Sequence, residues 1–143
     1  MSGSVPKGIT AYRIQYTSVD FFGNAIPVTG SVAFLYANRT NGRLFKTVAW
    51  AHGTSGVFKG CAPSVMSSLY EYSNWSYLIE RGYAVTATDY AGLSNNYASH
   101  PYITLPAHTN NVFYSVIAAR KLFGASLTTK WMRCYCESDR GLQ

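Results

Sequence analysis

The sequence is poor in charged residues. Of its 143 residues, 13% are Asp, Glu, Lys or Arg, against about a quarter in an ordinary globular domain. The basic residues are scattered from Lys7 to Arg140 without a run, and the formal net charge is +6. A nucleic-acid surface needs clustered Lys and Arg beside stacking aromatics, so nucleic acid is not an expected partner. The low charge also suggests that part of a larger fold is missing.

Long apolar runs are missing as well. No stretch reaches the roughly 18 consecutive apolar residues of a membrane helix, so no transmembrane segment is expected. The opening residues, MSGSVPKGIT, have no apolar core, and no signal peptide is visible there. No Gly-x-Gly-x-x-Gly follows the first predicted strand, which argues against Asp89 as the ribose-binding acid of a dinucleotide fold. No cofactor is expected.

Cysteine is scarce and odd in number, at Cys61, Cys134 and Cys136. A single residue separates the last two, which is too little chain for an easy disulfide between them. Neither spacing matches a zinc site, so no metal is expected. Asn-x-Ser/Thr triplets at Asn38 and Asn74 are compatible with secretion, although such triplets also arise by chance.

The hydrophobic pattern predicts strands in the first third of the chain. Residues 12–16 alternate between apolar and polar, and turn-forming residues at 20–24 lead into a second strand over 26–36. Pro27 and Gly30 inside the second strand indicate an edge or bulged strand.

The remaining pattern alternates between strand and helix. The predicted elements are a strand over 45–51, a helix from Ser67 or Ser68 to just before Gly82, a strand over 83–90, a helix over 109–123 and a strand starting near 127. The order β-β-β-α-β-α-β predicts an α/β fold, in which helices cover both faces of a mostly parallel sheet.

Candidate chemistry lies where two of these strands end. The strand over 45–51 runs directly into His52-Gly53-Thr54, and backbone N–H groups in such a loop can hold the charge that develops on a carbonyl oxygen. The alternative is a tight strand exit with no chemistry. Asp89 follows the next strand, and its commoner role is to accept backbone N–H groups of the turn after it.

Three blocks carry a family resemblance: AWAHGTSGVFKGCAPS, LIERGYAVTATDYAGL and FYSVIAARKL. In this order and spacing they resemble the secretory lipase family of fungi and bacteria, α/β-hydrolases similar to the type-A lipase of Candida antarctica. The resemblance covers about residues 11–131. It implies an incomplete α/β-hydrolase fold, the N-terminal half of a mostly parallel sheet with flanking helices.

The resemblance also implies roles for single residues. Gly53 and Thr54 match the loop that contributes one arm of the oxyanion hole. Cys61 matches a cysteine whose disulfide partner lies far downstream, while Asp89 and Gly92 match a structural turn. An ester or lipid substrate, a place in lipid catabolism and an extracellular location are implied with them.

The sequence departs from the family after Trp131. Family members continue through an apolar strand into Gly-x-Ser-x-Gly, where Gly on both sides allows a strained strand-to-helix bend. Here Ser138 is near the expected place, but Cys136 and Arg140 stand where Gly is wanted. Arg133 falls in a strand that should be buried. We therefore expect a degenerate nucleophile position and a divergent tail over 132–143, as a shifted reading frame or splice junction would produce.

Two functions remain open on this basis. The first is an N-terminal fragment of a serine lipase or esterase, a single partial domain over 1–143 that is inactive alone because its catalytic acid and His would follow the Ser. His100 and His108 lie upstream and are expected to be loop or surface histidines. The alternative is a non-catalytic binding or interaction module. In either case the sheet edge is a possible site of self-association.

Overall fold

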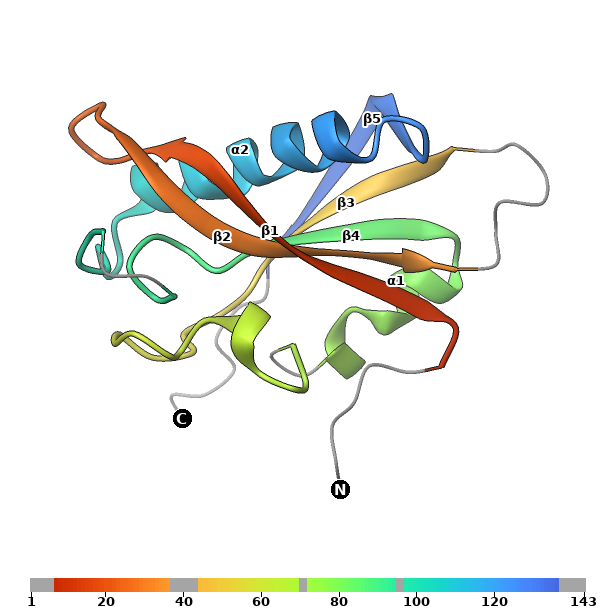
Figure 1. Cartoon of the computed structure of the whole chain (residues 1–143), viewed down its shortest axis with the longest axis horizontal. Coiled ribbons are helices and arrows are strands. Elements are labelled where there is room, and N and C mark those ends of the chain that lie inside the picture. Colours follow the sequence, from red (N-terminus) through yellow and green to blue (C-terminus); the bar gives the residue numbers. More distant parts are fainter. Residues whose placement is uncertain (1–6, 37–43, 70–71, 95–96, 137–143) are drawn as a thin grey trace.

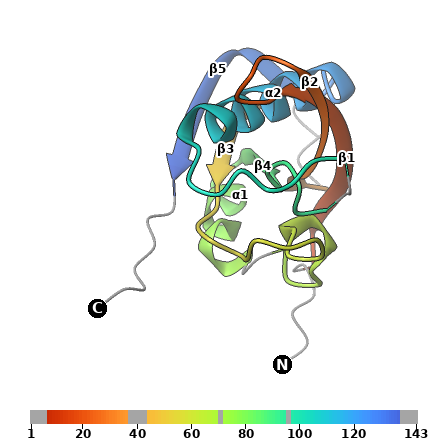
Figure 2. The same cartoon turned by 90° about the vertical axis from the view of Figure 1, so that its left-hand side faces the viewer.

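A computed structural model shows a curled sheet with helices on both faces (Figures 1 and 2). It describes residues 7–36, 44–69, 72–94 and 97–136, with the backbone alone over 130–136. The described residues form five strands and two α-helices: β1 (Ile9–Val19), β2 (Ala25–Leu35), β3 (Phe45–Ala51), α1 (Ser76–Glu80), β4 (Tyr83–Thr88), α2 (Leu105–Leu122) and β5 (Leu127–Cys136). The predicted element order is confirmed.

The first two strands form the expected hairpin. β1 and β2 pair antiparallel along their whole length, from Ile9 opposite Leu35 to Val19 opposite Ala25. Their connection is fixed by Asp20, whose Oδ1 accepts the backbone N–H groups of Phe22 and Asn24, both at 2.8 Å. A side chain that accepts nearby backbone donors stabilises a turn without help from the rest of the fold.

The prediction that β2 is an edge or bulged strand is wrong. The sheet order is β1-β2-β4-β3-β5, so β2 is an interior strand. Pro27 is tolerated because β4 pairs with β2 only from Gly30 to Ala33, and a missing N–H outside that segment breaks no bond to β4. Gly30 is needed because a Cβ there would lie 2.4 Å from the carbonyl oxygen of Ala87.

The last three strands run parallel. β3 pairs with β4 on one side and with β5 on the other. The register places Arg133 opposite Val48 and Cys136 opposite Ala51, so β5 extends through the first residues of the segment expected to diverge. The two strands are parallel, and their last residues, Ala51 and Cys136, lie opposite each other, so β3 and β5 end at the same edge of the sheet (Figure 2).

Both helices depart from the predicted bounds. α2 starts four residues earlier than expected, because Pro106 in its first turn has a preset φ and needs no hydrogen-bond acceptor. The predicted helix over 67–81 is reduced to the five residues of α1, preceded by a 3-10 turn over Tyr72–Asn74. Leu69 has a positive φ of 46°, which a right-handed helix cannot contain.

A hydrophobic core lies on each face of the sheet. Beneath α2, Val28, Val32 and Phe45 pack with Ala119. On the opposite face, Trp50 and other strand residues pack against Trp75 and Ile79 around α1. Alternate residues of one strand serve opposite faces, which explains the apolar runs of the interior strands. No helix within the described residues is long and apolar enough to span a membrane.

Candidate active site

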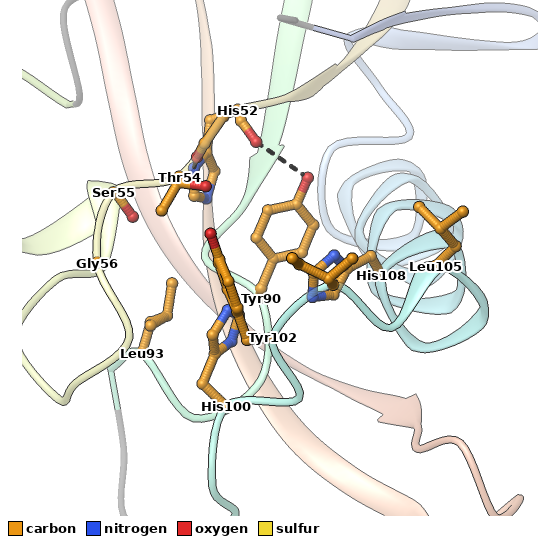
Figure 3. A pocket seen from close by; sticks show the side chains of 12 residues that line it. His52, Thr54, Ser55, Gly56, Tyr90, Leu93, His100, Tyr102, Leu105 and His108 are labelled. Atoms are coloured by element: carbon orange, nitrogen blue, oxygen red, sulfur yellow. Dashed lines mark hydrogen bonds between the residues drawn. The ribbon is translucent and has the colours of Figure 1, made fainter. Parts of the chain in front are cut away.

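A pocket of about 230 Å³ opens where β3 and β4 end (Figure 3). Its walls come from three segments: the loop after β3, the turn and loop after β4, and the first turn of α2. The lining residues are His52, Gly53, Thr54, Ser55, Gly56, Tyr90, Leu93, His100, Tyr102, Ile103, Leu105 and His108. The C-terminal edge of an α/β sheet is where such folds bind ligands.

The loop after β3 places both predicted oxyanion residues on the pocket wall. Gly53 is half-buried and Thr54 is exposed, and both line the cavity. Gly56, with a φ of 135°, lies so close to Cys61 that a Cβ there would be 2.3 Å from its sulfur. The thiol of Cys61 is free, and no disulfide is formed within the described residues.

The turn after β4 holds this loop in place. The hydroxyl of Tyr90 donates to the carbonyl of His52 at 3.2 Å (Figure 3), and the N–H of Gly60 donates to the carbonyl of Leu93 at 2.9 Å. Tyr90 itself has a positive φ of 57°. A bulky residue in that conformation is strained and persists only where the surroundings fix it.

Asp89 anchors the far end of the same loop. Its Oδ1 accepts the backbone N–H of Ser64 at 2.8 Å, and its Oδ2 accepts the hydroxyls of Ser64 and Thr29, both at 2.5 Å. The interpretation of Asp89 as a cap of its own turn is wrong, because Thr88 Oγ1 accepts the Tyr90 N–H instead. The carboxylate is only 1% exposed and connects β2, β4 and the loop.

All three histidines of the chain line the pocket. The ring of Tyr90 lies between two of them, with ring centroids 4.6 Å from His52 and 4.4 Å from His108. The rings of His100 and His108 stack at 5.4 Å and 15°. His100 does lie in a loop, but His108 is on α2 and half-buried. Nothing in the sequence predicted this cluster, because each histidine comes from a different segment.

Two of the three imidazoles are held by backbone carbonyls. Nδ1 of His52 donates to the carbonyl of Gly53 at 2.6 Å, and Nδ1 of His100 donates to that of Ala91 at 2.9 Å. Burial lowers the pKa of His52 to about 4, because desolvation penalises the imidazolium. Burial, followed by the nearby His100, also lowers the pKa of His108.

The predicted nucleophile position, Ser138, lies outside the described residues. It follows β5 by two residues, and the last residue of β5, Cys136, lies opposite Ala51, the residue before the loop that begins at His52. Within the described part of the chain, no group of His, Cys, Asp or Glu is arranged to hold a metal ion.

These features together define the fold class of the chain. A hairpin leading into parallel strands, helices on both faces and a pocket beyond the strand ends make up part of an α/β-hydrolase fold. Structural comparison supports this assignment. No protein-family model and no curated protein matches the sequence.

Three solved structures illustrate the likeness. Candida antarctica lipase A matches with a TM-score of 0.71 and 12% identity, over 95% of this chain and 35% of its own. A putative hydrolase from Legionella pneumophila matches with a TM-score of 0.66 and 22% identity, over 90% and 34%. The rice cell wall degrading esterase LipA from Xanthomonas oryzae gives 0.64 and 19%, over 89% and 34%. The chain therefore spans about a third of the structures it matches.

Proposed function

We propose that this chain is the N-terminal part of a secreted, lipase- or esterase-like serine hydrolase of lipid catabolism, and that its Gly53 and Thr54 form one arm of the oxyanion hole. The observation that carries the proposal is the register of β5. Cys136 lies opposite Ala51, so a nucleophile that follows β5 emerges beside the loop that begins at His52. An attacked carbonyl between them would have its oxygen within reach of that loop.

The chemistry of the complete enzyme follows from this arrangement. A serine after β5 attacks the ester carbonyl, and the alcohol leaves as an acyl-enzyme forms. N–H groups of the Gly53 and Thr54 loop, with the N–H after the serine, hold the oxyanion of the tetrahedral intermediate. A histidine takes the serine proton and passes it to the departing alcohol.

The pocket rim supports an apolar substrate. Ile103 and Leu105 both line the cavity and are 71% and 73% exposed. Ile103 has a positive φ of 58°, which costs a β-branched residue about 1–3 kcal/mol of strain. Exposed aliphatic groups at a pocket mouth suit the acyl or alkyl part of an ester better than a polar ligand.

We expect residues 1–143 alone to hydrolyse esters slowly or not at all. Ser138 is flanked by Cys136 and Arg140 instead of glycines. The Nδ1 groups of His52 and His100 donate to backbone carbonyls, whereas a catalytic histidine donates to a carboxylate that stabilises its protonated form.

Two measurements test the proposal. A ketone analogue of a short ester should shift the amide NMR signals of Gly53 and Thr54 if their N–H groups bind a carbonyl oxygen. Thr54→Pro, which removes one of the two N–H groups, should weaken the shift at Gly53, while the matched Ser55→Pro should preserve it. Unshifted amides at saturating ketone would refute the oxyanion role.

Hydrolysis of a short p-nitrophenyl ester is the second measurement. Turnover well above the blank that disappears in Ser138→Ala would show that residues 1–143 are a complete enzyme. The alternative, a non-catalytic module, predicts a cooperative melt and monomeric elution. Within the described residues β5 is the terminal strand of the sheet, so self-association through its open edge would instead favour the fragment.

A further inference from the structure

The three imidazoles of the pocket can each accept a proton, and the proposed hydrolysis does not use this capacity. His52 and His100 have their protons fixed on Nδ1, because a carbonyl oxygen can only accept. Their Nε2 atoms are therefore the positions that gain a proton when the rings become charged. In His108, Nε2 is buried and makes no hydrogen bond. The pocket thus holds three imidazole bases, and burial disfavours the imidazolium form of two of them, His52 and His108.

Few fixed charges oppose an anion at this site. The titratable groups around the pocket are the three histidines, Tyr90, Tyr102 and, behind His52, Asp89, with Lys59 in the adjoining surface groove beside His100. Asp89 does not line the cavity, and both its oxygens accept hydrogen bonds from Ser64. An anion that enters would therefore meet imidazoles and not carboxylates.

Three aliphatic side chains give the pocket an apolar part. Leu93 is buried, and Ile103 and Leu105 lie at the mouth. A ligand with one anionic end and a short alkyl chain would place its charge against the imidazoles and its chain against these side chains. A cavity of about 230 Å³ suits a chain of a few carbons.

We propose that this pocket is a proton-linked binding site for short-chain alkyl carboxylates, with His52, His100 and His108 as the bases that take up the proton bound together with the ligand. The choice of a carboxylate rests on the proposed function, since ester hydrolysis yields a carboxylic acid and an alcohol. The acid dissociates into a carboxylate and a proton, and an imidazole takes up that proton as an imidazolium. The carboxylate and the proton therefore both stay in the cavity, and the affinity for the carboxylate rises as the pH falls.

Calorimetric titration of the chain with hexanoate tests the proposal. Binding should tighten about tenfold per pH unit between about pH 7 and about pH 5, as expected when one proton binds with the ligand. Titrations in two buffers of different ionisation enthalpy should give the uptake of one proton. Hexanol, of the same length but uncharged, should show no such dependence on pH.

Histidine variants test whether the pocket histidines take up the proton that binds with hexanoate. His100→Gln and His108→Gln should each flatten the pH dependence. Lys121→Gln removes a positive charge from the exposed far end of the helix that carries His108, and should leave the dependence unchanged. An affinity that does not vary with pH, or an equal effect of Lys121→Gln, would overturn the proposal.

NMR keeps the test independent of whether the variants fold. The chain has three histidines, so their ring signals can be followed individually in the unaltered protein. Saturating hexanoate should raise the pKa of at least one of them by about two units, because a tenfold change per pH unit from about pH 7 to about pH 5 amounts to about a hundredfold change in affinity. Unmoved titration curves would refute the proposal. Hexanoate binding needs no ester turnover, so loss of the ketone-induced shifts at Gly53 and Thr54 with proton-linked hexanoate binding intact would refute the proposed function alone.

Discussion

Replacing Asp89 by Ala tests how the pocket loop is held. The substitution removes the acceptor of three hydrogen bonds, from the Ser64 N–H, the Ser64 hydroxyl and the Thr29 hydroxyl. The hydroxyls can rotate toward other acceptors, but the N–H direction is fixed. An orphaned buried donor costs about 1–3 kcal/mol, and each lost bond to a charged acceptor about 1.5–3 kcal/mol. Part of this is offset because a buried carboxylate is no longer desolvated. We expect a net loss of about 3 kcal/mol.

Asp89→Asn should cost far less. The amide oxygen can keep the bond from the Ser64 N–H, and its two N–H groups then point toward the hydroxyl oxygens of Thr29 and Ser64, which can accept. Hydrogen bonding survives while the charge is lost, and we expect a loss of about 1 kcal/mol. The ratio of the losses in unfolding free energy for Asp89→Ala and Asp89→Asn therefore reports whether hydrogen bonding or charge contributes more to stability at this position.

Urea unfolding followed by the fluorescence of the three tryptophans, of which Trp50 and Trp75 lie in the core, gives these values. With a slope of about 1–3 kcal/mol per molar urea, the Ala variant should shift the midpoint by about 1–3 M. Asp20→Ala is the matched control, because Asp20 also accepts three hydrogen bonds, but at an exposed turn. Water can replace its acceptors there. An equal loss from Asp20→Ala would refute the claim that burial sets the cost.

The remaining predictions concern single residues in the core, the pocket and the loop. Ile79→Ala, at a side chain that is 0% exposed, should cost about 2–5 kcal/mol, whereas Leu122→Ala at an exposed position should cost little; urea midpoints compare the two. The depressed pKa of His52, about 4, means that the unfolded chain binds a proton at higher pH than the folded one. Stability should therefore fall as pH drops from about 6.5 to about 4, by up to about 1.4 kcal/mol per unit, and His52→Gln should flatten that part of a stability–pH curve; an unchanged slope would contradict the linkage. Gly56→Ala should displace the loop, since its Cβ would overlap the Cys61 sulfur, and the amide shifts expected with a ketone should weaken at Gly53; an unaltered response would show that the loop can adjust.

Sequence reasoning located the strands better than the helices. Strand patterns follow burial, and β3, with nearly every residue buried, is apolar almost throughout. The prediction of a helix over 67–81 was wrong because the spacing of apolar residues carries no information about the positive φ of Leu69. The interior place of β2 was missed because strand order depends on long-range pairing, and Pro27 gave a misleading local signal.

The candidate site was predicted in part. Gly53 and Thr54 follow a strand directly, so their place on the pocket wall could be inferred from the chain itself. The histidine cluster could not, because His52, His100 and His108 meet only after three segments fold together. The same holds for Asp89, whose partners lie 25 and 60 residues away along the chain.

Those separations bear on how the protein is made. The β1–β2 hairpin closes through its own turn, so we expect it to form as soon as it leaves the ribosome, since local contacts form fastest. The Thr29 hydroxyl must then wait for a partner 60 residues later, and β2 has one unpaired edge until β4 is synthesised. The nascent chain passes through a stage with an open apolar strand edge, the kind of surface that chaperones recognise and that promotes aggregation. Slower synthesis between the two segments would prolong that stage.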